Sequence, residues 1–310
     1  MNRTWKALAL ACLLAASPAL AGRDWNSVKS WVYQLTNYKD GKLDQIADAG
    51  FDLAVIDLAR DGKTGFFTRE EIAAAQKKGM VVLAYFEVGA IENYRPEWDQ
   101  VPEDLKLGRV QGWPKERLVR FWDERWWPVV KGRVDQALKA GFDGAYLDMV
   151  TAYEQAPATE FKREELAQKM VELISRLSQY AKAANPQFKI VPQNSPELYS
   201  WNFWEAKPNQ KYIEAVDGIG MEDVFYLAHD KPAKMKWCEE NRQNALAIKQ
   251  AGKLVLAVDY AKTPACITDA YTKERALGFV PYVTVVALDR VSKEPPAAQN
   301  QPGPGQPAPK

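Results

Sequence analysis

Acidic side chains recur at the predicted carboxyl ends of the strands in this 310-residue sequence. They are Asp57 in Val-Ile-Asp-Leu, Glu87 in Tyr-Phe-Glu-Val, Asp148 in Tyr-Leu-Asp-Met, Asp259 in Ala-Val-Asp-Tyr, and the neighbours Glu222 and Asp223 in Gly-Met-Glu-Asp-Val. Parallel strands that are covered on both faces should be almost entirely apolar, and a buried carboxylate without a partner is costly. The repetition therefore indicates acids that are kept for chemistry at one end of a sheet.

Crowded carboxyl groups raise one another's pKa, which can hold a protonated acid beside an ionised carboxylate. Glycoside hydrolysis requires that combination, because one carboxyl protonates the leaving oxygen while the other acts as nucleophile or base. For any single acid, an ion pair or a helix cap explains the residue equally well, but the whole set favours catalysis.

Amide and aromatic side chains accompany the acids. Amides suit sugar hydroxyls, and flat aromatic rings suit the apolar faces of sugar rings. We therefore predict a substrate-binding site formed by Gln34, Asp57, Glu87, Tyr146, Asn194, Asp223, Tyr226, Asp259 and Tyr260.

Other chemistries have little support in the sequence. It contains one histidine, His229, which argues against a histidine-ligated zinc centre and against a Ser-His-Asp mechanism. It has no Gly-rich phosphate loop and no lysine at a predicted strand end that could form a Schiff base. We therefore expect no metal or cofactor. The formal net charge of +1 gives no support for a nucleic-acid partner.

The elements that must position these residues alternate between β-rich runs and helical patterns. The β-rich runs are Trp31–Tyr38, Phe51–Leu58, Met80–Gly89, Phe142–Val150, Lys189–Asn194, Gly218–Tyr226, Lys253–Tyr260 and Phe279–Leu288. Eight such runs predict a single α/β domain, a (β/α)8 TIM barrel, whose active site lies at the carboxyl ends of its strands. Residues 91–125 form a long insertion after the third strand, and no convincing helix follows the last strand.

The two ends of the sequence read differently from the barrel. Arg3 and Lys6 precede an apolar stretch that is too short to span a membrane, and Ala19-Leu20-Ala21 offers a cleavage site, so residues 1–21 are predicted to be a signal peptide. A lipid attachment at Cys12 is a weaker alternative. We expect the barrel to occupy residues 22–291, followed by a disordered Pro- and Gln-rich tail at 292–310, in an exported, periplasmic or extracellular monomer.

Export leaves Cys238 and Cys266 in an oxidising compartment, where an even number of cysteines favours a disulfide. Cys238 is placed early in the sixth helix and Cys266 in the loop after the seventh strand, both at the active end of the barrel. We predict that they form a disulfide that ties neighbouring loops. Two unrelated thiols are the alternative.

Five runs, in this order, resemble glycoside hydrolase family 114, the endo-α-1,4-polygalactosaminidases. They are residues 31–35 (WVYQL), 51–57 (FDLAVID), 84–89 (AYFEVG), 141–148 (GFDGAYLD) and 218–226 (GIGMEDVFY). The resemblance implies a TIM barrel with a catalytic Asp on the fourth strand and a catalytic Glu on the sixth. The matching positions are Asp148, as nucleophile, and Glu222, as acid/base. Asp223 is the alternative to Glu222, but successive strand residues point to opposite faces and we choose Glu222.

One departure bears on the substrate. This sequence has Leu-Asp-Met around Asp148 where fungal members of the family have Pro-Asp-Asn, so it is more similar to the bacterial branch. The resemblance implies a polysaccharide substrate, a partly deacetylated α-1,4-linked galactosamine polymer, whose positive charge suits an acidic site. The alternatives are a non-catalytic glycan-binding barrel and another carbohydrate-active enzyme, either a deacetylase or a hydrolase of a neutral glycan.

Overall fold

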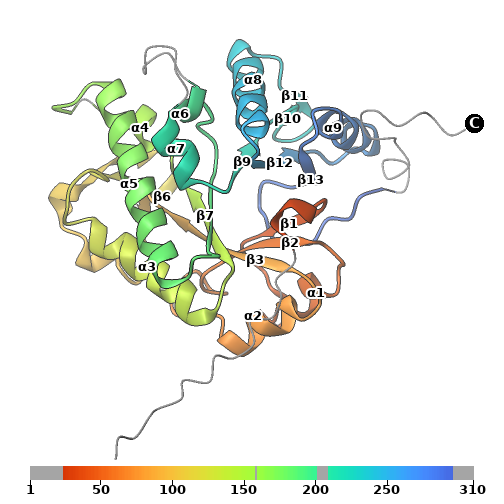
Figure 1. The fold of residues 1–310 in the computed structure, drawn as a ribbon, viewed down its shortest axis with the longest axis horizontal. Coiled ribbons are helices and arrows are strands. Elements are labelled where there is room, and N and C mark those ends of the chain that lie inside the picture. The colour runs from red at the N-terminus through yellow and green to blue at the C-terminus, as the bar shows by residue number, and fades with distance from the viewer. Residues whose placement is uncertain (1–23, 158, 201–208, 296–310) are drawn as a thin grey trace, which may run out of the picture.

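The computed structural model describes residues 24–157, 159–200 and 209–295 (Figure 1). Each predicted β-rich run contains one strand. These strands are β1 (Trp31–Gln34), β2 (Leu53–Asp57), β3 (Val81–Glu87), β7 (Gly144–Asp148), β8 (Lys189–Pro192), β9 (Gly218–Glu222), β12 (Leu254–Tyr260) and β13 (Val280–Thr284). All five residues of β2 are buried, as aliphatic runs covered on both faces require.

The strands run parallel in two sheets, ordered β1-β2-β3-β7-β8 and β13-β12-β9. A parallel bridge between Gln193 and Gly220 joins the β8 and β9 edges. At the other junction, the Trp31 indole of β1 donates to the Val280 carbonyl of β13 at 3.0 Å, and the Leu35 amide donates to the Leu288 carbonyl at 2.7 Å. The predicted α/β architecture, a (β/α)8 barrel, is confirmed, with side-chain and loop contacts between β1 and β13.

Helices alternate with these strands and surround them (Figure 1). The outer helices are α1 (Asp44–Ala47), α2 (Arg69–Gln76), α3 (Trp127–Ala140), α5 (Arg163–Ala184), α7 (Gln210–Ala215), α8 (Lys236–Gln250) and α9 (Pro264–Ala276). Short helices α4 (Ala152–Gln155) and α6 (Glu197–Ser200) lie in loops after β7 and β8. Short 3-10 turns are η1 (Trp25–Ser27), η2 (Lys39–Gly41), η3 (Trp98–Gln100) and η4 (Glu103–Leu105).

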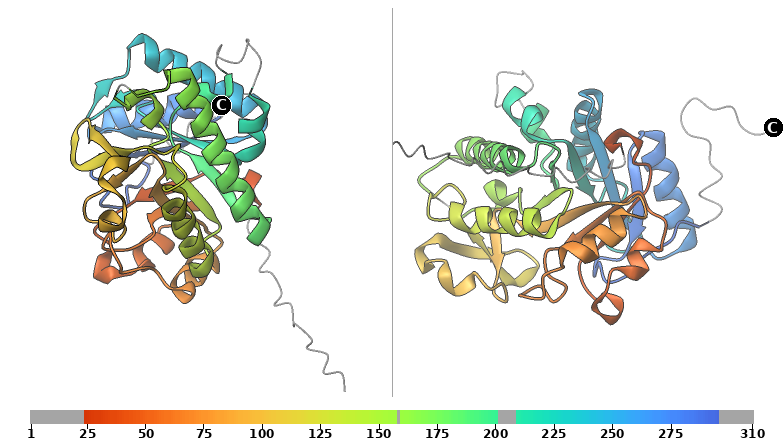
Figure 2. Two further views of the ribbon diagram at one scale, coloured as in Figure 1. Left: turned by 90° about the vertical axis from the view of Figure 1, so that its left-hand side faces the viewer. Right: turned by 60° about the horizontal axis from the view of Figure 1, so that its bottom comes forward.

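The insertion after β3 folds into its own antiparallel sheet, with strands β4 (Ala90–Glu92), β5 (Lys106–Val110) and β6 (Trp113–Val119) in the order β4-β6-β5. It lies on the side of the barrel formed by α3 and α5, opposite α9 (Figure 2). A small hairpin of β10 (Tyr226–Leu227) and β11 (Lys231–Pro232) follows β9. In the described residues after β13, which end at 295, no helix forms, as predicted.

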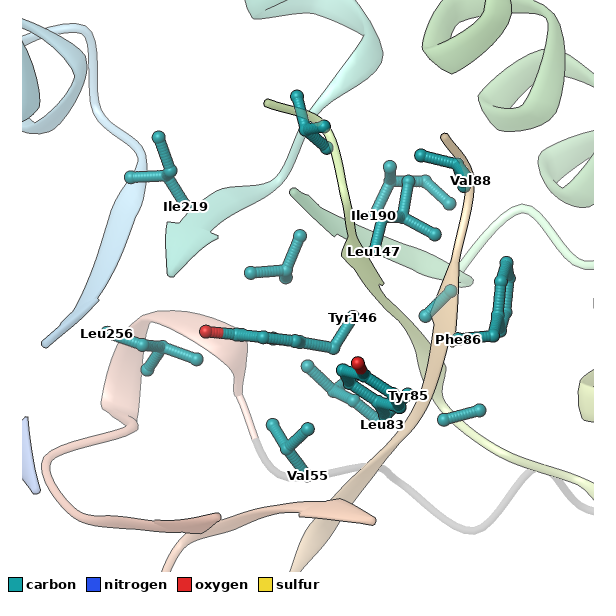
Figure 3. Packing of buried hydrophobic residues seen from close by; sticks show 14 of the residues in the cluster. Val55, Leu83, Tyr85, Phe86, Val88, Tyr146, Leu147, Ile190, Ile219 and Leu256 are labelled. Atoms are coloured by element: carbon teal, nitrogen blue, oxygen red, sulfur yellow. The ribbon is translucent and has the colours of Figure 1, made fainter. Parts of the chain in front are cut away.

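Aromatic side chains fill the centre of the barrel. The rings of Trp31 and Tyr33 stack with centroids 5.7 Å apart, and Tyr33 contacts Tyr146 at 5.3 Å. Figure 3 shows the Tyr146 ring crossing the interior from β7, with its hydroxyl directed toward Leu256. A Cβ atom on Gly220 would lie 1.9 Å from that hydroxyl, so only glycine fits at this position of β9. This aromatic layer forms the floor beneath the strand ends.

The disulfide expectation is not met, because Cys238 and Cys266 are both free thiols. Cys238 is buried beside Val224 and Phe279, whereas Cys266 packs against a separate small cluster that contains Tyr226 and Tyr271. Placing both cysteines at one end of the barrel did not determine which way each thiol points.

Two predictions fall largely outside the described residues: the signal peptide at 1–21, and the tail at 292–310 beyond residue 295. Within the described part of the chain, none of the helices combines the length and the apolar composition that crossing a membrane requires.

Candidate active site

Asp148 and Glu222 are the last residues of β7 and β9, and each is followed by a strained residue. Met149 has φ of 55° and Asp223 has φ of 54°. A positive φ is unfavourable for residues with a Cβ and persists only where the surrounding structure imposes it, often at functional sites. Asn194 and Ser195, just after β8, share this conformation with φ of 62° and 54°. Four of the eight non-glycine residues with positive φ in the described part of the chain therefore lie on the loops that border the two acids.

Asp148 is held by two donors. The Tyr85 hydroxyl donates to Oδ2 at 2.6 Å, and the Met149 amide donates to Oδ1 at 2.6 Å. Burial raises the pKa of Asp148 to about 6, the nearby charge of Glu222 raises it further in the same direction, and the bond from Tyr85 opposes both. Asp148 therefore titrates close to neutral pH while its oxygens keep a fixed orientation.

Glu222 is oriented by neutral partners. Its Oε1 accepts a hydrogen bond from the Tyr260 hydroxyl, and its Oε2 accepts one from the Asn194 amide at 3.1 Å. The Glu222 backbone amide in turn donates to Asn194 Oδ1 at 3.0 Å, which fixes the orientation of that side chain. No cation among these partners neutralises the carboxylate, so it remains available for a reaction.

Tyr146 is near enough to both acids to be affected by their charges. Burial raises its pKa well above the ordinary value, and the charges of Glu222 and Asp148 add to that effect. Its hydroxyl is buried and makes no hydrogen bond to the described residues. Asp148, Glu222, Tyr146, Asn194 and Tyr260, all predicted from the sequence, are thus brought together inside the barrel mouth.

A cleft of about 850 Å³ opens beside Glu222. Its lining includes the acids Glu154, Glu197, Glu222, Asp223, Glu239 and Glu240 and one cationic side chain, Arg163. Arg163 is itself paired with Glu154 at 3.2 Å. Glu222 borders the cleft, whereas Asp148 lies at the barrel interior beyond its lining residues. The cleft is strongly acidic and accessible to a ligand.

Asp223 differs from its neighbour in its contacts. It lines the cleft together with Glu222, but its buried Oδ1 has no hydrogen-bond partner among the described residues. Burial raises the pKa of Asp223 to about 7, with the charges of Glu222 and Asp259 acting in the same direction. Asp223 follows the end of β9 with a positive φ, and of the two adjacent acids it is Glu222 whose charge acts on Asp148.

Four predicted site residues serve other contacts. Gln34 donates to the carbonyl of Thr36 at 2.9 Å, and both oxygens of Asp259 accept from the Phe225 amide at 3.0 Å. The Tyr226 hydroxyl donates to Asp269 at 2.7 Å. Asp57 accepts two bonds from Arg95, at 2.8 and 2.9 Å. These contacts hold loops at the barrel mouth and leave the four side chains apart from Asp148 and Glu222.

Glu87 belongs to a second acidic group that the sequence pattern did not separate from the first. The Arg95 cluster consists of Asp57, Glu87, Glu92, Arg95 and Glu116. Arg95 binds Glu92 at 2.7 Å as well as Asp57. Burial would raise the pKa of Glu92, but Arg95 holds it at about 2.

Burial raises the pKa of Glu116 to about 8, and Asp148 adds to the shift. Glu92, Arg95 and Glu116 come from the insertion, and only its position after a strand hinted that it would reach the site.

A sequence model described as glycoside hydrolase family GH114 matches residues 15–298. The chain belongs to this family. An uncharacterised protein of Deinococcus radiodurans is 32% identical over 271 residues, covering 86% of this chain and 83% of that protein. An uncharacterised protein of Methanocaldococcus jannaschii is 31% identical over 268 residues, covering 82% of this chain and 74% of the relative.

Two solved structures support the fold of this GH114 protein. The Aspergillus fumigatus Ega3 complex with galactosamine is 18% identical, with a TM-score of 0.66, covering 86% of this chain and 95% of that chain. The glycoside hydrolase domain of PelA from Pseudomonas aeruginosa is 16% identical, with a TM-score of 0.68, covering 86% and 98%. Together with the family match, these findings identify the protein as a glycosidase.

Proposed function

We propose that this GH114 protein is an exported hydrolase of an amino-sugar polysaccharide, most specifically of a partly deacetylated α-1,4-linked galactosamine polymer. The observation that carries the proposal is the meeting of Asp148 and Glu222 inside the barrel mouth, beside an acidic cleft. Two carboxyl groups at one site are what glycosidic cleavage requires. The substrate-binding residues we propose beside them are Tyr146, Asn194, Asp223 and Tyr260.

Asp148 is proposed as the nucleophile and Glu222 as the acid/base. Asp148 lies deeper and is fixed by Tyr85 and the Met149 amide, an arrangement that suits attack on a sugar carbon from within the barrel. Glu222 borders the cleft into which a leaving chain must depart. Asp148 Oδ forms a bond to the anomeric carbon while the Glu222 proton passes to the departing glycosidic oxygen. Glu222 then takes a proton from water, whose oxygen attacks the same carbon and releases Asp148.

The charge of the cleft supports an amino sugar. At neutral pH a deacetylated hexosamine carries an ammonium group, and the acids of the cleft offer the complementary charge. The name of one similar structure, the Ega3 complex with galactosamine, records the same sugar class for that protein. A neutral glycan would gain nothing from this excess of carboxylates.

Digestion of partly deacetylated α-1,4-galactosamine polymer, followed by mass spectrometry of the soluble products, tests the proposal. The parent protein should release shortened oligosaccharides, and Asp148→Asn and Glu222→Gln should not. Asp48→Asn is the matched control, because its side chain is 66% exposed at the end of α1 and pairs only with Lys78 at the surface. If the parent and both variants bound the polymer without cleaving it, the protein would be a binding protein. Release of acetate that a chelator abolishes would identify a deacetylase.

The configuration of the new reducing end tests the two roles. NMR during the first minutes should show the α-anomer, because displacement by Asp148 and then by water inverts the carbon twice. An initial β-anomer would make Asp148 a base that activates water instead.

Export is the part of the proposal that rests on the N-terminal pattern alone. The charged start, the short apolar run and Ala19-Leu20-Ala21 support cleavage after Ala21. Sequencing of the mature protein from cells that produce the whole chain should therefore begin at Gly22. A chain that keeps Met1 inside the cell would contradict this.

A further inference from the structure

The lining of the cleft contains an exposed tryptophan on α8. Trp237, in the first turn of α8, is 45% exposed, whereas Trp31 and Trp126 are fully buried. Residues 237, 241 and 244 are spaced as i, i+4 and i+7, so Trp237, Asn241 and Asn244 share one face of α8, and all three line the cleft. A large aromatic side chain that faces a polar cleft gains nothing from that exposure unless a ligand covers it.

The facing wall is formed by α4 and α6. The Tyr153 hydroxyl bonds Glu197 and also lies 2.9 Å from Glu154 Oε1, so two carboxyls converge on one hydroxyl. A hydroxyl has a single proton to donate, so it satisfies one of the two carboxylates at a time. Both acids line the cleft, as does the buried Ser195, whose Oγ is left without a hydrogen-bond partner in the described part of the chain. Arg163 pairs with Glu154 at 3.2 Å, whereas Glu197 has no ion pair with a cation of the described residues, so a cation of the substrate could pair with it.

The two walls are close enough to act together. Helices α6 and α8 are neighbours in the structure (Figure 1), and both contribute to one cleft of about 850 Å³. That volume is near the upper end of the range for small-molecule sites, about 300–1,000 Å³, and exceeds what one sugar needs. Because Glu222 borders the same cleft, the space continues from the reacting bond toward Trp237.

We propose that α6 and α8 form a separate subsite for one hexosamine unit of the chain on the leaving-group side of the cleaved bond. This inference rests on the proposed function and on Glu222 as the acid. Trp237 packs against the apolar face of the sugar ring, while Glu154 and Glu197 bind its ammonium group. The subsite selects a deacetylated unit at a distance from the reacting bond and contributes to binding of the polymer, not to bond cleavage.

Binding measured without turnover tests this subsite. In the Asp148→Asn background, calorimetry with α-1,4-galactosamine oligomers of increasing length should show a rise in affinity once the oligomer reaches Trp237. Adding Trp237→Ala should lower the affinity of those longer oligomers about fivefold to tenfold, the size expected for one lost aromatic contact. The shortest oligomers should bind unchanged, and Trp237→Phe should keep most of the affinity.

Two matched variants sharpen the test. Trp113→Ala removes a tryptophan that is 56% exposed at the start of β6 and does not line the cleft, so it should leave every affinity unchanged. Glu197→Gln should lower the affinity for deacetylated oligomers and leave the affinity for N-acetylated oligomers of equal length unchanged.

The outcomes separate the two proposals. Length-dependent affinity in the parent that Trp237→Ala does not alter would overturn the subsite alone. If no oligomer binds the parent background, the proposed substrate fails and the subsite fails with it. Thermal unfolding of each variant checks that a lost affinity does not come from a lost fold.

Discussion

Two groups of carboxyls lie at the same end of the barrel, and they differ in what holds them. In the Arg95 cluster, one guanidinium binds Asp57 and Glu92 together. Asp148 and Glu222 are held by Tyr85, Tyr260 and Asn194, which donate hydrogen bonds but carry no charge. A paired cation offsets the free-energy cost of removing a carboxylate from water and also lowers its reactivity. Neutral donors orient the carboxylate and leave its charge available. The two groups thus differ in their partners, and also in exposure, because Asp57 and Glu92 are buried whereas Asp148 and Glu222 are partly exposed at their strand ends.

Glu87 connects the two groups. It ends β3 directly opposite Asp148 on β7, and Glu92 on β4 lies opposite Glu116 on β6. Burial raises the pKa of Glu87 well above its usual range, and Glu92, Glu116 and Asp148 all act in the same direction. The insertion therefore places a partly protonated set of carboxyls next to Asp148.

The largest expected effect is a loss of activity without a loss of stability when either of the two acids is replaced. Replacing Asp148 by Asn or Glu222 by Gln should lower kcat by about 10²–10⁴-fold, because general acid–base and nucleophilic steps are lost. Asp148→Asn should also raise the free energy of unfolding at pH 8, because it removes a buried charge that costs stability there. Steady-state kinetics and urea denaturation measure the two quantities. If these variants lost activity because they unfold, the contrast between the Asp148–Glu222 pair and the Arg95 cluster would disappear.

Replacing Arg95 should lower stability, in contrast to replacing either of the two acids. Arg95→Met leaves Asp57 and Glu92 buried without their cation, which should lower the free energy of unfolding by about 3–5 kcal/mol. Arg290→Met is the matched control, because that exposed arginine pairs with Asp289 at the surface and should change stability by less than about 1 kcal/mol. Urea denaturation at pH 7 compares them. Equal, small effects of the two variants would show that the Arg95 cluster is not structural.

The sequence predicted the barrel well because its signals are local. Aliphatic runs such as Leu53–Asp57 and the capping box at Thr68 and Glu71 depend on neighbouring residues, and both are present in the structure. Whether an acid is paired with a cation does not depend on its neighbours in the sequence. Asp57 and Asp148 end their strands in the same way, and only the insertion, which brings Arg95 to one of them, distinguishes the two.

Orientation was the other quantity that the sequence could not supply. Strand alternation was the reason for choosing Glu222 over Asp223, but Asp259 and Tyr260 alternate in the same way and both were predicted to bind substrate. The structure turns Tyr260 toward Glu222 and Asp259 toward the Phe225 amide. The cysteines failed for a similar reason, because a shared end of the barrel does not fix the direction of a side chain.

The hydroxyl of Tyr85 should have a smaller effect than either acid. Its bond opposes the raised pKa of Asp148, so Tyr85→Phe should raise that pKa by about one unit, since a hydrogen bond to a charged group is worth about 1.5–3 kcal/mol. The acid limb of the kcat/KM profile should move upward by the same amount. Tyr226→Phe is the control, because it removes a similar bond to Asp269, away from the pair. Identical profiles for both variants would contradict the role of Tyr85.

The dependence of stability on pH tests the same contrast without a substitution. Folding raises the pKa of Asp148 to about 6, of Asp223 to about 7, and of Glu116 and Glu197 to about 8, in each case first through burial. As pH rises above the ordinary carboxyl range near 4, the unfolded chain releases these protons before the folded protein does. Their contribution to stability is therefore complete below that range and is lost as pH rises through 6 to 8.

The free energy of unfolding should thus fall from pH 5 to pH 8 in urea titrations. Glu92, whose pKa is held at about 2, stays ionised throughout this window and contributes no slope. Asp148→Asn should flatten the part of the curve between pH 5 and pH 7 and leave the part near pH 8, where Glu116 and Glu197 titrate. A parent protein that becomes more stable toward pH 8 would mean that cations compensate these acids as fully as Arg95 compensates Asp57, and the contrast between the two groups would disappear.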